Sequence, residues 1–97
     1  LSQEQTVAAG ATLVIVAPPS QAIMTVVTAT GTHAIYAYAS AAASITKVSG
    51  SAVFSAASVA PPPLASGQIS AAVDAGNLYI RNDTGAAVSL LLAFLGG

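Results

Sequence analysis

Short runs of β-branched and aliphatic residues recur along the chain, and clusters of glycine, proline, serine or Asn-Asp separate them. Their spacing of roughly 8–12 residues is typical of a β-sandwich or barrel. Alanine is frequent and favours helix, but the glycines recur too closely for helices of ordinary length. The runs predicted as strands are Gln5–Ala8, Thr12–Ala17, Ala22–Ala29, Thr32–Ala39, Ser44–Val48, Ala52–Ala56, Gln68–Val73, Asn77–Asn82 and Ala86–Phe94.

The segments between the runs predict turns and one long connection. The Ala-Gly pair at 9–10 and the Thr-Gly pair at 30–31 each suggest a tight hairpin. The Asn-Asp-Thr-Gly segment at 82–85 favours a turn that joins the last two strands as a hairpin. Residues 57–66 contain three consecutive prolines and predict a stiff crossover with partly polyproline II geometry.

These elements predict a single all-β domain over residues 1–97. A long connection midway through an antiparallel chain suits a jelly-roll or Greek-key path better than a meander. We therefore predict an antiparallel β-sandwich, jelly-roll or Greek-key, of about eight short strands. Residues 1–6 are a possible flexible or exchanged N-terminal arm, and 57–66 form the proline-rich crossover.

Two segments, Thr12–Val16 and Val88–Leu95, are apolar on both faces of the predicted strand. An antiparallel sheet normally keeps one face in contact with water. A strand that is apolar on both faces is either central under a second layer or part of a subunit interface, and we favour the interface. The candidate interface residues are Val88, Leu90, Leu91, Leu92, Phe94, Leu95, Tyr36, Tyr38, Tyr79 and Arg81.

Composition narrows the choice of partners. The chain has two basic and three acidic residues, is 55% hydrophobic and has a net charge of −1, whereas soluble domains are about one quarter charged. Without clustered Lys and Arg we expect no nucleic-acid partner and no anionic membrane surface. Cysteine does not occur in the sequence, so disulfides and Cys-based metal sites are excluded.

The sparse titratable residues give little basis for catalysis. A glycosidase needs two facing carboxylates, but Glu4 lies in the predicted arm and Asp74 and Asp83 lie in turns. His33 is the only histidine, too few for a metal shell. Arg81 either pairs with Asp83 or anchors a contact to another chain. We therefore expect no enzyme activity, no metal and no cofactor.

The C-terminal third carries a family resemblance. The segment Gly-Asn-Leu-Tyr-Ile-Arg-Asn-Asp-Thr-Gly at 76–85, the apolar last strand, the short arm and the Ala/Thr/Val-rich composition resemble small virion proteins of tailed bacteriophages. These are capsid decoration (cement) proteins and head or tail fibre domains. The resemblance, carried mainly by residues 67–97, implies a commonly trimeric subunit on the virion surface that caps a capsid. Its partners would be itself and a major capsid or other shell protein, with Leu1–Thr6 as an arm on a neighbour.

Two other function classes remain open from the sequence. A subunit of an extracellular filament or pilus would have similar composition and would receive its missing strand from a neighbour's N-terminal arm. A carbohydrate-binding module would use exposed aromatic rings, for which Tyr36, Tyr38 and Tyr79 are the candidates because the chain has no tryptophan.

Overall fold

All regular structure in the described part of the chain is β-strand. A computed structural model describes residues 2–95. The strands are β1 (Ser2–Val7), β2 (Thr12–Val16), β3 (Gln21–Thr28), β4 (His33–Ala39), β5 (Ser44–Gly50), β6 (Phe54–Ala56), β7 (Ile69–Val73), β8 (Asn77–Asn82) and β9 (Val88–Leu95).

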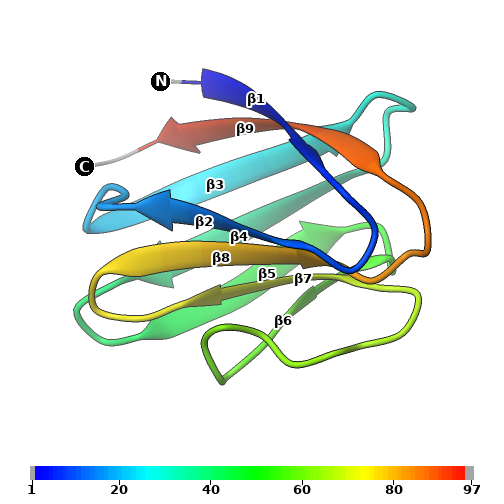
Figure 1. Cartoon of the computed structure of the whole chain (residues 1–97). Coiled ribbons are helices and arrows are strands. Elements are labelled where there is room, and N and C mark those ends of the chain that lie inside the picture. Colours follow the sequence, from blue (N-terminus) through cyan, green and yellow to red (C-terminus); the bar gives the residue numbers. More distant parts are fainter. Residues whose placement is uncertain (1, 96–97) are drawn as a thin grey trace.

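The strands form two sheets that pack face to face (Figure 1). Sheet A has the order β1-β9-β3-β4-β5 and sheet B the order β2-β8-β7-β6. Strands β3, β4 and β5 are consecutive neighbours and β9 returns to lie beside β3, which gives the spatial order of a Greek key with three strands of sheet B inserted before its fourth strand. The predicted all-β sandwich is confirmed, and within it only β6 and β7 pair in parallel.

Of the three predicted hairpins, one is confirmed and two are wrong. The turn at 30–31 joins β3 to β4, where the Thr28 N–H donates to the Thr32 carbonyl at 2.8 Å. The turns at 9–10 and 82–85 instead carry the chain from one sheet to the other. Their flanking strands find other partners, since β1 pairs with β9 and β2 with β8. The residues of a turn determine that the chain reverses direction there, but they do not determine which strands pair with each other.

The N-terminal segment is a strand of its own chain. Residues 2–7 form β1, which pairs antiparallel with β9 from Ser2 opposite Ala93 to Val7 opposite Val88. The structure therefore holds this part of the predicted arm in cis, at the edge of sheet A. Leu1, the first residue of that prediction, lies outside the described residues.

Alternating side chains build the core between the sheets. Alternate residues of β3, β4 and β8 are buried, and in β9 Leu90 and Leu92 are buried on either side of the exposed Leu91, as the period of a strand requires. Each large apolar side chain buried there stabilises the fold by about 1.5–3 kcal/mol. The largest of them are Tyr36, Phe54, Met24, Ile69, Leu78, Ile80, Leu90, Leu92 and Val26.

Strand β7 is buried on both faces. Its inner face meets the core through Ile69, Ala71 and Val73. The Ala57 N–H donates to the carbonyl of Ala71 at 2.8 Å and so continues the pairing of β6 with β7 beyond Ala56, and Pro62 in the connection is fully buried. The proline-rich crossover is therefore packed against the sandwich at its start and at Pro62.

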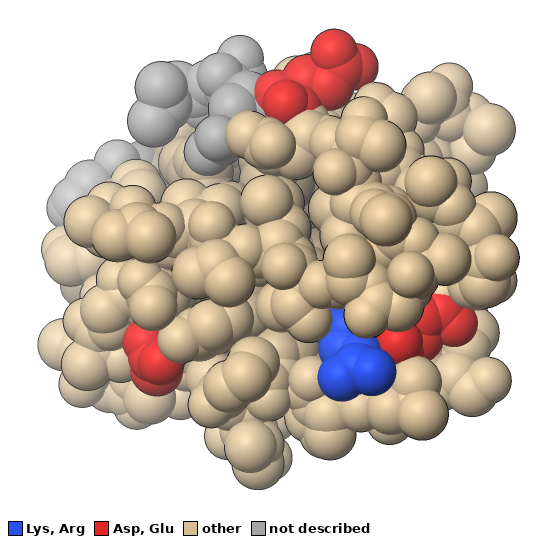
Figure 2. Space-filling view, in the orientation of Figure 1, with Lys and Arg blue, Asp and Glu red and all other residues tan. Residues whose placement is uncertain are grey.

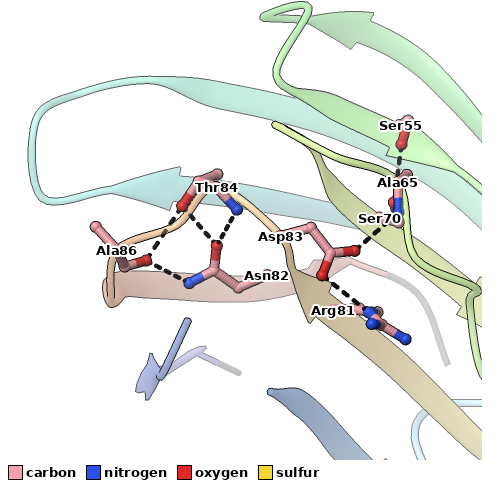
Figure 3. Close-up of polar contacts among 8 residues, drawn as sticks. All are labelled: Ser55, Ala65, Ser70, Arg81, Asn82, Asp83, Thr84 and Ala86. Carbon is pink, nitrogen blue, oxygen red and sulfur yellow. Dashed lines mark hydrogen bonds and ion pairs between the residues drawn. The ribbon is translucent and has the colours of Figure 1, made fainter. Parts of the chain in front are cut away.

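Asn82 ties together two of the four places where the chain changes sheets, the β1–β2 and β8–β9 connections. Figure 3 shows its contacts in the β8–β9 turn. Its buried side chain donates to the carbonyls of Val7 (2.9 Å) and Ala86 (2.7 Å) and accepts from the Thr84 N–H (3.0 Å) and hydroxyl (2.7 Å). Its backbone N–H donates to the Ala11 carbonyl and its own carbonyl accepts from the Gly10 N–H. One residue thus fixes the ends of β1, β8 and β9 relative to one another.

Replacing Asn82 with alanine should destabilise the fold strongly. The Asn82→Ala variant removes the side-chain donor to the Val7 carbonyl and leaves the Ala86 carbonyl only the bond from the Thr84 hydroxyl at 3.1 Å. We expect a loss of about 3 kcal/mol in the free energy of unfolding. The matched control is Asn77→Ala at the other end of β8, which loses only a half-buried bond to the Tyr79 hydroxyl and should cost less than about 1 kcal/mol. Equal losses in urea unfolding would contradict the role of Asn82.

Two buried tyrosines of β4 differ in whether their hydroxyls are satisfied. The Tyr36 hydroxyl donates to the carbonyl of Ser55 on β6 at 2.9 Å. The Tyr38 hydroxyl is buried without a hydrogen-bond partner among the described residues, while its ring makes an edge-to-face contact with Phe94 at 6.4 Å. Burial raises the pKa of both hydroxyls, so both stay protonated at neutral pH.

These two tyrosines should respond oppositely to loss of the hydroxyl. Tyr36→Phe removes a satisfied bond between the sheets and should destabilise the chain by about 1 kcal/mol. Tyr38→Phe removes a buried unpaired hydroxyl and should leave stability unchanged or raise it by up to about 1 kcal/mol. Thermal or urea unfolding of the two variants measures the difference, and a larger loss for Tyr38→Phe would overturn this assignment.

Candidate interaction surface

The acidic residue of the β7–β8 turn serves a structural purpose. Asp74 Oδ1 accepts from the N–H groups of Gly76 (2.9 Å) and Asn77 (2.8 Å), and Oδ2 accepts from the Tyr79 hydroxyl at 2.7 Å. The bond from Gly76, followed by those from Tyr79 and Asn77, lowers the pKa of the carboxyl. Asp74 closes the turn and holds Tyr79 against it.

Asp83 fastens the crossover to the end of β8 (Figure 3). Its Oδ2 accepts from the Ala65 N–H at 2.9 Å and its Oδ1 pairs with Arg81 Nε at 3.0 Å. The hydrogen bond from Ala65 is the largest cause of a lowered pKa, burial opposes it, and Arg81 lowers the pKa further. Of the two roles considered for Arg81, the structure shows the pairing with Asp83.

The remaining ionisable side chains lie apart from these two. Glu4 on β1 accepts from the Ser89 hydroxyl at 3.4 Å, and Lys47 on β5 donates to the Ser51 carbonyl at 2.7 Å. His33 is exposed at the start of β4. Among residues 2–95 no three His, Cys, Asp or Glu side chains gather closely enough to hold a metal ion.

The predicted aromatic platform does not exist. Tyr36 and Tyr38 are 1% and 5% exposed because they point into the core from β4, so they can provide neither a carbohydrate platform nor a subunit contact. Tyr79 lies on the opposite sheet, half-buried and bonded to Asp74. Alternation in β4 places the two tyrosines on one face, and that face is the inner one.

Four of the six predicted interface residues on β9 also belong to the core. Leu90 and Leu92 are fully buried, and Val88 and Phe94 pack against the same cluster. These four are corrected to core residues, because β9 lies between β1 and β3 rather than at an edge. Leu91 and Leu95 point outward and are 44% and 75% exposed.

Leu91 and Leu95 belong to a wider apolar surface on the outer face of sheet A. Register places Leu91 beside Val27 and Leu95 beside Ile23, and Ile23 lies beside Ala37 of β4. We call this surface the outer-face patch. It consists of Ile23, Val27, Ile35, Ala37, Leu91, Ala93 and Leu95. The residues of β3 and β4 were missing from the predicted interface, although their alternation with buried neighbours marks them as outward-facing.

The outer-face patch has little charge around it. Glu4, opposite Leu91, is the described acidic residue at its border, and a shallow depression of about 500 Å³ lies among Ile23, Ala37 and Leu95. The opposite side of the molecule also has charged atoms only as isolated spots (Figure 2). Contiguous apolar surface without charge is typical of protein–protein contact sites.

Comparison of the chain with protein-family models, curated proteins and solved structures found no match. The described residues include no helix long and apolar enough to cross a membrane.

The two structural carboxylates predict how stability depends on pH. Asp74 and Asp83 both have a pKa below the ordinary 3.8. Their stabilisation is therefore complete above that value and is lost as the pH falls through their lower folded pKa. We expect the urea midpoint to fall below about pH 4, and the Asp74→Asn/Asp83→Asn double variant to show a flatter acid dependence. An acid dependence as steep in the double variant as in the native chain would refute this.

Proposed function

We propose that the chain is a non-enzymatic structural subunit of a symmetric assembly. The supporting observation is the outer-face patch, whose exposed leucine and isoleucine side chains lie among small residues, with Glu4 at the border beside Leu91. Burial of such side chains between copies removes apolar surface from water. Identical copies are the default partners for such a surface in soluble oligomers.

The placement of the ionisable groups supports a structural role over a catalytic one. Asp74 and Asp83 are engaged in turn and crossover contacts, and Arg81 is paired with Asp83. Low net charge also weakens repulsion between closely packed copies. These features favour a protein whose surface, rather than a reactive cleft, performs the function.

Within this class we propose a decoration (cement) protein that stabilises a phage capsid from the virion surface. The support is the resemblance of residues 67–97 and of the overall composition to small virion proteins. The assembly proposed is a trimer that contacts a major capsid protein through a surface separate from its own subunit contacts. Strand exchange in a filament is less favoured, because β1 already pairs with β9 over six residues of its own chain. The carbohydrate-binding alternative is also less favoured, because Tyr36 and Tyr38 are buried in the core.

A charge at Leu91 should dissociate the assembly. Leu91→Asp and Leu91→Lys each place a charge in the outer-face patch, and both should reduce the mass measured by light scattering toward the 9.4 kDa of one chain. The two variants separate assembly from folding, because Lys at this position faces Glu4 across the ladder and Asp does not pair with it.

The control is Val59→Asp, which changes an exposed apolar side chain in the β6–β7 connection, outside the outer-face patch. It should keep the native mass. The proposal is wrong if both Leu91 variants retain the native mass while remaining folded.

A further inference from the structure

The two sheets have four edge strands, and three of them carry features that discourage pairing with another chain. Strand β1 carries Glu4, and β6 has only three residues. Strand β5 has a register irregularity opposite Ile35 and Tyr36, and its Lys47 points to the half-buried side. Charges, bulges and short length are the usual protection of exposed sheet edges.

The fourth edge strand, β2, has none of these features. It reads Thr-Leu-Val-Ile-Val, pairs regularly with β8 and has no further strand of sheet B on its other side. Val14 and Val16 are 46% and 75% exposed on its outer face. An unprotected apolar edge of this kind is a template for another strand.

The hydrogen-bond pattern shows which backbone groups remain open at this edge. The Asn82 N–H donates to the Ala11 carbonyl and the Ala17 N–H donates to the Gly76 carbonyl, each at 3.0 Å. In an antiparallel ladder alternate residues face the partner, so the odd-numbered residues of β2 face β8. The N–H and C=O groups of Thr12, Val14 and Val16 therefore point away from β8, toward the open edge.

We propose that β2 pairs antiparallel with β2 of a second copy across a twofold axis at Val14. This inference rests on the proposed assembly function. A twofold contact cannot close a trimer, so it joins a subunit of one trimer to a subunit of another and is separate from the contacts within a trimer. Val14 then lies opposite Val14 of the second copy, and Thr12 lies opposite Val16, so that all the outward N–H and C=O groups of these residues find partners. Sheet B becomes continuous between the two copies.

Several features of β2 favour a second copy of this chain as the occupant. On the outer face valine meets valine, and on the inner face the half-buried Leu13 lies beside Ile15 of the second copy, so no charge is opposed or buried. The prolines at 18–19 follow β2 directly and cannot donate to a longer ladder. They end the pairing at Val16 and so favour the register centred on Val14.

Single cysteine variants test both the contact and its register, because the native chain has no cysteine. In the proposed pair the two Val14→Cys positions lie about 5.5 Å apart between Cα atoms, within the range for a disulfide. Two Val16→Cys positions lie about 13 Å apart, four residues along the strand, although Val16 is the more exposed side chain. Under mild oxidation Val14→Cys should form covalent dimers at least about tenfold faster than Val16→Cys.

A mixture of Thr12→Cys and Val16→Cys chains should crosslink as fast as Val14→Cys alone, since these positions lie opposite each other in the proposed register. Equal rates for Val14→Cys and Val16→Cys, or no dimer from Val14→Cys, would overturn the β2 contact. If the crosslinking test fails in this way but the Leu91 variants have a lower mass than the native oligomer, the proposed function stands without the β2 contact. A native chain with the mass of one copy and no crosslinking overturns both.

Discussion

The side chain of Asn82 is the constraint on which the sandwich depends. A chain that moves between two sheets at both ends must bury polar backbone where it turns, and those groups need partners. Asn82 satisfies the carbonyls of Val7 and Ala86 together and is itself satisfied by Thr84. With these turns held by Asn82, β1 pairs with β9 in one sheet and β2 pairs with β8 in the other. The inner faces of the two sheets then pack against each other around one core.

The small number of ionisable groups also explains why the exposed surface is mostly uncharged. The few ionisable groups are mostly engaged in local contacts: Asp74 closes a turn, Asp83 and Arg81 hold the crossover, and Lys47 bonds to the backbone near its own strand. All residues of β7 are buried, so this strand presents no open face. What remains exposed is an apolar outer face on sheet A and an apolar edge at β2. A surface of this composition is best explained by contact with other copies.

Alternation and turn residues predicted the strands well, because the period of two in Leu78 to Arg81 is decided locally. Local patterns did not predict which strands pair. Residues 82–85 have strong turn chemistry, yet the turn joins different sheets, since the partner of β9 is set by packing of the whole chain. For the same reason the tyrosines of β4 were placed on one face but assigned to the surface. The inner face of a strand is fixed only once the opposite sheet is known.

Light scattering of the native chain across dilution and salt concentration tests assembly through uncharged surfaces most directly. A discrete mass that is a multiple of 9.4 kDa is the predicted result. Added salt should not reduce it, because contacts without ion pairs are not weakened by screening. A mass of 9.4 kDa at every concentration would contradict assembly, and an oligomer that dissociates in salt would contradict the uncharged contact surface.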